Sequence, residues 1–387
     1  MKITVPTIDF GTSKIVTMVA QSNGERCDIV GSGAVPYSGY LQDGWNNPDE
    51  IRDVIRTAID QAQKTGNCRI HELNVGVPGM FTRVIVKEVH VSLTGPDPHV
   101  TAQDVRACFK LAEESGGDRI IHSAPAWFRV DDGKKTLSPV GIKGRELSAM
   151  IALVTADKYF IDDITYRLRD MDIEPREFYS TVAGEATYAL SQDERDKTAM
   201  LIDIGYLCTD VMVMEGDALI FHKCLDIGGG HISADIAEQL NIPFPFVEEK
   251  IKQTYSFNST NQDETYVIPA TEDEPARTVR RDEVTPIIEA KVEEIAEAIN
   301  KALEEGGVKL GKWSNVYLTG GGLILNKGGK DFLAGKLHRI IREAQRTNNK
   351  MTSHVFSSAV GLTILVVTTQ EEQKAPEGGA KGLFSRA

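Results

Sequence analysis

An internal repeat limits the folds that are open to this chain of 387 residues. Ile8-Asp9-Phe10-Gly11 ends one strand-like run, and Ile202-Asp203-Ile204-Gly205 ends another 194 positions later. Two further strand-like runs follow each of them, and then a helix-like segment, at 48–65 in the first half and at 232–240 in the second. In 48–65 the apolar residues recur every three or four positions, as on the buried face of a helix. The repeat predicts a duplicated α/β fold.

The charge balance and the apolar runs exclude several classes of protein. The formal net charge is −13, which disfavours binding to the phosphate backbone of nucleic acid. Apolar runs such as 362–367 are far shorter than the ~20 residues that a membrane-spanning helix needs. The first six residues contain neither the apolar core nor the cleavage site of a signal peptide. We therefore expect a cytoplasmic protein without a nucleic-acid partner.

The cysteines are odd in number and never stand in C-x-x-C spacing. The sequence therefore supports neither a disulfide framework nor a zinc site, and predicts small core or loop residues instead. The five are Cys27, Cys68, Cys108, Cys208 and Cys224.

Three further segments interrupt or follow the repeat. Strand-like and helix-like segments between the two halves predict a small inserted α+β unit. Its helix begins at Thr101, with Asp104 in a capping-box position. The polar stretch 254–283 precedes a long amphipathic helix and indicates an ordered lobe with a loose tip. The stretch 368–380 is rich in Glu, Gln, Lys, Pro and Gly, which is typical of a disordered tether.

Glycine-bearing turns carry the chemistry of this sequence. The turns at 9–14, 203–210 and 318–322 contain glycine and small hydroxyl residues, so that backbone N–H groups can approach a phosphate closely. Asp9 and Asp203 precede the first two turns and are candidate ligands, through water, of a magnesium ion. The alternative is an ordinary hairpin with Asp as a turn residue. Before the helix at 232–240 three glycines precede His231, which we interpret as a capping or packing residue.

In their order and separation, these turns resemble the two phosphate motifs and the adenosine motif of the actin-like ATPase superfamily, and within it the FtsA cell-division proteins. The resemblance covers about residues 3–367 and implies an actin-like (ribonuclease H-like) α/β fold of two duplicated lobes with an FtsA-type inserted α+β subdomain. It also implies the following division of the chain: 1–83, 155–197 and 351–367 form the first lobe, 84–154 the insert, 198–240 and 307–350 the second lobe, 241–306 its upper subdomain, and 368–387 a disordered tether with a short apolar tip.

The resemblance also implies a site for ATP and Mg²⁺, with at most weak ATPase activity. Asp9 and Asp203 would hold the metal through water, and Glu185 would orient the attacking water. The residues implied to contact the nucleotide are Gly11, Thr12, Ser13, Lys14, Gly205, Thr209, Gly228, Gly229, Glu249, Lys252, Gly320, Gly321 and Gly322. In one departure from the family, Tyr206, Leu207 and Cys208 follow Gly205 where the family has mostly glycines.

The resemblance implies a division scaffold that self-associates and links the tubulin-like division filament protein to the cytoplasmic membrane. The acidic, apolar C-terminal tail of the filament protein would bind the lobe at 241–306, with Arg280, Arg281 and Lys291 as cations. Other division proteins would bind the insert. The protein would lie at the inner face of the membrane near the division site. Burial of Leu383 and Phe384 in the membrane would contribute only about 3–6 kcal/mol of free energy, so membrane contact would be weak and would need several copies. Alternatives are a nucleotide-free scaffold, a PilM-type pilus assembly protein and a small-molecule kinase.

Overall fold

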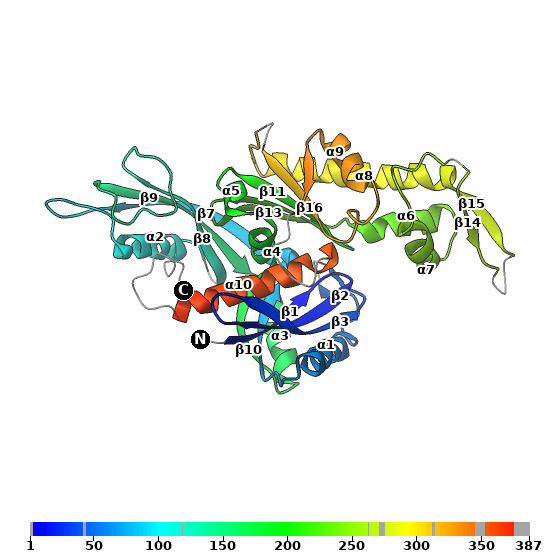
Figure 1. The fold of residues 1–387 in the computed structure, drawn as a ribbon, viewed down its shortest axis with the longest axis horizontal. Helices are drawn as coiled ribbons and strands as arrows, with labels where there is room; N and C mark the ends of the chain where they lie inside the picture. The colour runs from blue at the N-terminus through cyan, green and yellow to red at the C-terminus, as the bar shows by residue number, and fades with distance from the viewer. Residues whose placement is uncertain are drawn as a thin grey trace. The chain divides into compact units, whose positions relative to one another are not determined.

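The computed structural model describes residues 3–374, except 42–43, 118, 262, 271–274, 312–313 and 345–352 (Figure 1). The chain divides into two compact units. The first contains Met1–Leu201, Met212–Lys223 and Gln345–Ala387, and the second contains Ile202–Val211 and Cys224–Ala344. Within the described ranges, no helix is long and apolar enough to cross a membrane.

A five-stranded sheet in the order β10-β6-β1-β2-β3 forms the framework of the first unit. β1 (Ile3–Phe10), β2 (Lys14–Ser22) and β3 (Cys27–Pro36) form an antiparallel meander. β6 (Glu72–Val77) pairs in parallel with β1, and β10 (Glu174–Ser180) pairs in parallel with β6. The antiparallel meander and the parallel strands place the end of β1, and Asp9 with it, at an inner position of the sheet.

Four helices accompany this sheet. α1 (Ile51–Gly66) turns its apolar face to β2 and β3, and α3 (Lys158–Arg169) packs on β10. α4 (Thr181–Ala189) follows β10 directly, and α10 (Ser357–Lys374) packs on β1, β2 and α4 (Figure 1). The short elements β4 (Tyr40–Leu41), β5 (Gly44–Trp45), η1 (Gly79–Phe81), α5 (Gln192–Arg195) and η3 (His354–Phe356) complete the connections.

The second five-stranded sheet has the order β13-β12-β11-β16-β17 and repeats the topology of the first. Its strands are β11 (Ala199–Ile204), β12 (Thr209–Glu215), β13 (Ala218–Leu225), β16 (Asn315–Thr319) and β17 (Ile341–Glu343). In each sheet three consecutive strands are extended on the side of the first strand by two strands from later in the chain. The duplication predicted from the sequence is therefore present in the fold.

The helices of this half lie between the strands of the sheet in the chain, and one of them, α8 (Arg281–Glu305), is long. α6 (Gly229–Gln239) packs on α8, which also contacts α9 (Gly329–Leu337). α7 (Phe244–Phe246) runs into the π-helical turn η2 (Val247–Lys252). The stretch predicted as a loose tip contains an antiparallel hairpin of β14 (Thr265–Ile268) and β15 (Arg277–Arg280).

An α+β unit is inserted in the first half of the chain. β7 (Thr82–Ser92), β8 (Ile120–Val130) and β9 (Glu146–Ala156) form an antiparallel sheet with β9 in the centre. α2 (Ala102–Glu114) packs on β7 and β9. It begins with the predicted capping box, since the Thr101 hydroxyl and the Asp104 carboxylate each accept a backbone N–H of the other residue.

The C-terminal helix differs from the sequence prediction at its end. The tether was expected from residue 368, but α10 continues to Lys374. Gln370 is buried and its side-chain amide donates to the Asn74 side chain (3.3 Å), and Ser22 hydrogen-bonds to Glu371. Specific tertiary contacts of these polar residues thus outweigh their disorder-prone composition. Residues 375–387, which include the predicted apolar tip, lie outside the described residues.

Candidate functional site

The first acid–glycine turn connects β1 to β2. Asp9 is the second-last residue of β1 and is buried, and its carboxylate accepts hydrogen bonds from Ser358 Oγ (2.7 Å) and Thr181 Oγ1 (3.5 Å). Both hydroxyls belong to first turns of helices, where partial positive charge favours an anion. Burial raises the pKa of the Asp9 carboxyl, while the Ser358 hydrogen bond and the charge of Lys14 lower it. Asp9 is therefore a buried, tightly positioned carboxylate.

The other residues of this turn are held by their neighbours. Thr12 is buried, and the carbonyl of Ser13 accepts the Tyr37 N–H (3.1 Å). The Tyr37 hydroxyl donates to the carbonyl of Gly11 (2.7 Å). The ammonium of Lys14 lies 5.3 Å from the centre of the Phe356 ring. The predicted first phosphate loop is thus a well-supported turn.

The second acid–glycine turn repeats a backbone hydrogen bond of the first and the position of its aspartate. Asp203 is the second-last residue of β11, as Asp9 is of β1. The N–H of Gly11 donates to the Lys14 carbonyl (3.1 Å), and the N–H of Gly205 donates to the Cys208 carbonyl (2.9 Å). The repeat therefore extends from the strand order to individual hydrogen bonds.

Three glycine segments meet around the second turn. Gly229 N–H donates to the carbonyl of Gly205 (2.9 Å), and Gly230 N–H to that of Tyr206 (2.7 Å). Gly322 N–H donates to the carbonyl of Ile204 (2.7 Å). The structure thereby brings together Asp203, Gly205, Gly228, Gly229, Gly320, Gly321 and Gly322, which the sequence places more than 20 positions apart in three groups.

Close packing explains why these positions hold glycine. A Cβ on Gly229 would collide with the backbone of Gly322, and one on Gly320, whose φ is +86°, would collide with the Asp203 carboxylate. From the sequence, these glycines are predicted to present N–H groups to phosphate. Yet the N–H groups of Gly11, Gly205, Gly229 and Gly322 bond to carbonyls of the chain itself. At these positions glycine allows backbones to approach one another.

Thr209 and His231 also hold the turn in place. The Thr209 side chain is fully buried, and its hydroxyl donates to the Ile227 carbonyl (2.7 Å), which fixes β12 to the segment before α6. His231 Nδ1 accepts the N–H of Gly228 (3.0 Å), as its interpretation as a capping residue requires. The Thr209 hydroxyl thus has a structural role, and its contact with a nucleotide stays a prediction.

The residues implied to contact the nucleoside are only partly brought together. Lys252 is buried at the end of η2 and pairs with Glu248 (3.1 Å) rather than with Glu249, which is exposed. Burial lowers the pKa of the Lys252 ammonium, and Glu248 offsets part of this effect. The carbonyl of Lys252 accepts the Asn326 amide (2.6 Å). Glu248 and Asn326 were missed because neither has a recognisable local motif.

Tyr206 lies among these residues. Its ring is close to Gly230, where a Cβ would approach the ring carbons to 3.1 Å, and the Lys252 ammonium lies 5.8 Å from the ring centre. Burial, and then the charge of Glu248, raises the pKa of the Tyr206 hydroxyl. The ring is thus directed toward α6 and η2, beside the residues predicted to contact the nucleoside.

Glu185 lies in the first unit at a close helix crossing. It is buried in α4, and a Cβ on Gly361 of α10 would come within 2.5 Å of its Cα. Gly184 and Gly361 therefore permit α4 and α10 to touch at the backbone. Thr181, at the start of the same helix, was missed in the sequence, although a helix-start hydroxyl is a readable signal.

Comparison with known proteins places this geometry in context. The sequence matches the family model "Cell division protein FtsA" over residues 200–361 and the model of the SHS2 domain inserted in FtsA over residues 79–155. FtsA of Pseudomonas aeruginosa is 24% identical over 376 residues, covering 94% of this chain and 89% of that protein. FtsA of Bacillus subtilis is 26% identical over 306 residues, covering 78% and 70%.

Solved structures show the same architecture at low identity. The PilM–PilN type IV pilus biogenesis complex aligns with a TM-score of 0.63 and 16% identity, over 94% of this chain and 99% of that chain. MreB5 of Spiroplasma citri aligns with a TM-score of 0.59 and 10% identity, over 96% and 99%. Together with the insert, these similarities confirm an actin-like fold of FtsA type.

Proposed function

Because two domain models of FtsA together match more than half of this chain, it belongs to the FtsA family of cell division proteins, and we propose that it acts as an actin-like, ATP-binding scaffold in division. In this proposal it self-associates and links the tubulin-like division filament to the membrane. The observation that supports nucleotide binding is the pair of acid–glycine turns with matching hydrogen bonds at the ends of β1 and β11. MreB5 of Spiroplasma citri, a structural relative, was crystallised with ADP and with AMPPNP.

Each turn offers side chains of the chemistry that a magnesium nucleotide requires. Asp9 and Asp203 offer carboxylate oxygens, which suit a hydrated Mg²⁺ ion. Thr12, Ser13 and Lys14 offer hydroxyl groups and one ammonium to phosphate oxygens. When bound, the metal would neutralise phosphate charge. Glu185 stays our proposal for the residue that orients water.

Thermal unfolding with and without Mg-ATP tests nucleotide binding. ATP at 100 times its Kd should raise the free energy of unfolding by ~2.7 kcal/mol. Asp9→Asn should abolish the shift, whereas Asp60→Asn, on the exposed side of α1, should keep it. A wild-type protein that shows no shift with ATP in large excess would refute this part of the proposal.

A second candidate is a scaffold of the same fold that binds no nucleotide. The position of Tyr206 favours it, because the ring lies beside Gly230 and Lys252 where the family places small residues. Tyr206→Ala distinguishes the two: an ATP-induced shift that appears only in this variant shows that the ring closes the site. A shift already present in the wild type supports the first candidate.

Of the three cations proposed to bind the filament protein's tail, Arg281 and Lys291 have other partners in the structure. Arg281 is buried, donates to Glu264 (2.9 Å) and lies 4.3 Å from the centre of the Tyr255 ring. Its role is to hold the start of α8 in place. Charge reversal there would disturb folding as well as binding.

Lys291 is similarly engaged, since it pairs with Asp235 (2.9 Å) and Glu294 (2.6 Å). Arg280 pairs with Asp282, yet its side chain is 64% exposed. We therefore propose Arg280 as the cation that meets the filament protein's tail. Arg280→Glu should weaken capture of the tail peptide, whereas Lys301→Glu, on exposed α8 surface, should not. Equal capture by both variants would exclude this role.

A further inference from the structure

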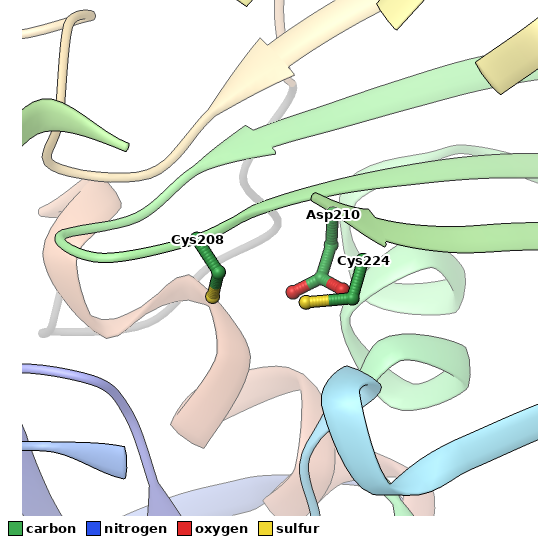
Figure 2. A group of neighbouring side chains, drawn as sticks. All are labelled: Cys208, Asp210 and Cys224. Carbon is green, nitrogen blue, oxygen red and sulfur yellow. The ribbon is translucent and has the colours of Figure 1, made fainter. Parts of the chain in front are cut away.

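Two cysteines and an aspartate converge on adjacent strands of the second sheet. Cys208 stands immediately before β12, Asp210 is the second residue of β12, and Cys224 is the second-last residue of the neighbouring β13. Residues two positions apart in a strand face the same side, so Cys208 and Asp210 point together. In Figure 2 the three side chains lie on the same side of these strands, and the Cys224 sulfur lies beside the Asp210 carboxylate and extends toward Cys208.

The ligand atoms of these three residues are close enough to share one ion. Their sulfur and carboxylate oxygen atoms all lie within 4.8 Å of one another. Around a tetrahedral zinc ion, with Zn–S of about 2.3 Å and Zn–O of about 2.1 Å, two ligand atoms are roughly 3.6–3.8 Å apart. The separations of at most 4.8 Å exceed these distances by about 1 Å, so side-chain rotations can close the group around a metal.

We propose that Cys208, Asp210 and Cys224 form a binding site for a thiophilic divalent cation, with Zn²⁺ as the physiological candidate. Two thiolates and one carboxylate are a ligand set that zinc accepts, and three protein ligands leave the fourth position for water. Sulfur ligands exclude Mg²⁺ and Ca²⁺, which prefer oxygen. Asp210 and Cys224 are half-buried and give access from solvent, while Cys208 is buried.

The site adjoins the second acid–glycine turn. The carbonyl of Cys208 accepts the Gly205 N–H (2.9 Å), and Thr209, between Cys208 and Asp210, donates to the Ile227 carbonyl (2.7 Å). A bound ion would cross-link the end of this turn to Cys224 of β13, which lies three residues before Ile227. It would thereby fix the segment that carries Tyr206 and Leu207. This inference does not depend on nucleotide binding.

Metal retention by the reduced, chelator-treated full chain tests the site. After addition of one equivalent of Zn²⁺ and gel filtration, elemental analysis should find about one zinc per wild-type chain. Cys208→Ser and Cys224→Ser should each lose it, and Asp210→Asn should retain it more weakly. Cys68→Ser, which changes a cysteine of the first unit, is the matched control and should retain it. Co²⁺ in place of Zn²⁺ should give thiolate-to-metal absorption in the wild type and in Cys68→Ser only.

Two outcomes would overturn the proposal. One is a wild-type protein that retains no zinc although all five thiols titrate as reduced after denaturation. The other is equal retention by Cys208→Ser and the wild type. Unfolding midpoints of the metal-free variants, compared with that of the metal-free wild type, verify that a loss of zinc does not reflect a loss of folding.

Discussion

The hydroxyl of Ser358 donates a hydrogen bond of 2.7 Å to the carboxylate of Asp9, across 349 positions of the sequence. The bond fixes the first turn of α10 to the end of β1, and Thr181 of α4 reaches the other carboxylate oxygen. The acid proposed to hold magnesium is thus positioned by helices from distant parts of the chain. Its geometry depends on the folded core of the first unit.

The buried charge of Asp9 should reduce stability at neutral pH. Burial raises its folded-state pKa above the unfolded value, so the folded protein binds more protons between the two values. Stability therefore falls as pH rises through this window. Asp9→Asn should flatten this pH dependence and leave the free energy of unfolding at neutral pH equal to or above that of the wild type. Urea unfolding at several pH values measures both effects.

Ser358→Ala is the complementary variant to Asp9→Asn. It removes a hydrogen bond that lowers the Asp9 pKa, so the window should widen and stability at neutral pH should fall by about 1.5–3 kcal/mol. In an Asp9→Asn background, Ser358→Ala should reduce the free energy of unfolding by less. A strong loss of stability in Asp9→Asn alone would show that the carboxylate is needed for folding rather than for a ligand.

The crossing of α4 and α10 should not tolerate a methyl group. In Gly361→Ala the new Cβ would lie 2.5 Å from the Cα of Glu185, a backbone atom that cannot rotate away. We expect a loss of about 1–3 kcal/mol in urea unfolding, because overpacking forces the helices apart. Gly335→Ala in α9 is the control: its Cβ meets no atom within 4 Å, and alanine is the better helix former. Equal stability of the two variants would contradict this account.

Tyr206 should control nucleotide affinity through its ring. Tyr206→Ala should strengthen the Mg-ATP-induced rise in melting temperature, because the ring lies beside Gly230 and the Lys252 ammonium. Tyr206→Phe keeps the ring and should behave as the wild type. If both variants lose the shift, the hydroxyl takes part in binding and the ring is no obstacle. Titration of ATP by calorimetry checks the affinities directly.

The local parts of the fold and of the site were readable in the sequence. Strand alternation, the acid–glycine turns and the capping box at Thr101 depend on neighbours in the chain, and the structure has all three. The partners that cross the chain were not readable. Lys252 pairs with Glu248, and Cys224 meets Cys208 through strand pairing rather than spacing. The end of α10 was misjudged for the same reason, since Gln370 is ordered by Asn74.

Among the charged residues of the first unit outside the proposed site, Arg195 should be the one whose substitution reduces the free energy of unfolding most. Its buried guanidinium donates to the carbonyls of Leu190 (2.7 Å) and Gly216 (3.1 Å) and pairs with Asp217 (3.2 Å). These bonds connect the end of α4 to the turn between β12 and β13.

Arg195→Lys should therefore reduce the free energy of unfolding by about 1–3 kcal/mol, because one ammonium cannot replace a planar fork and leaves buried carbonyls unsatisfied. Arg176→Lys, in the exposed pair with Glu72 (3.0 Å), should change stability by less than about 1 kcal/mol. Urea unfolding of both variants makes the comparison, and circular dichroism establishes that each is folded. A small effect at Arg195 would mean that water or rearranged side chains satisfy those carbonyls, so that the guanidinium is dispensable for joining α4 to the β12–β13 turn.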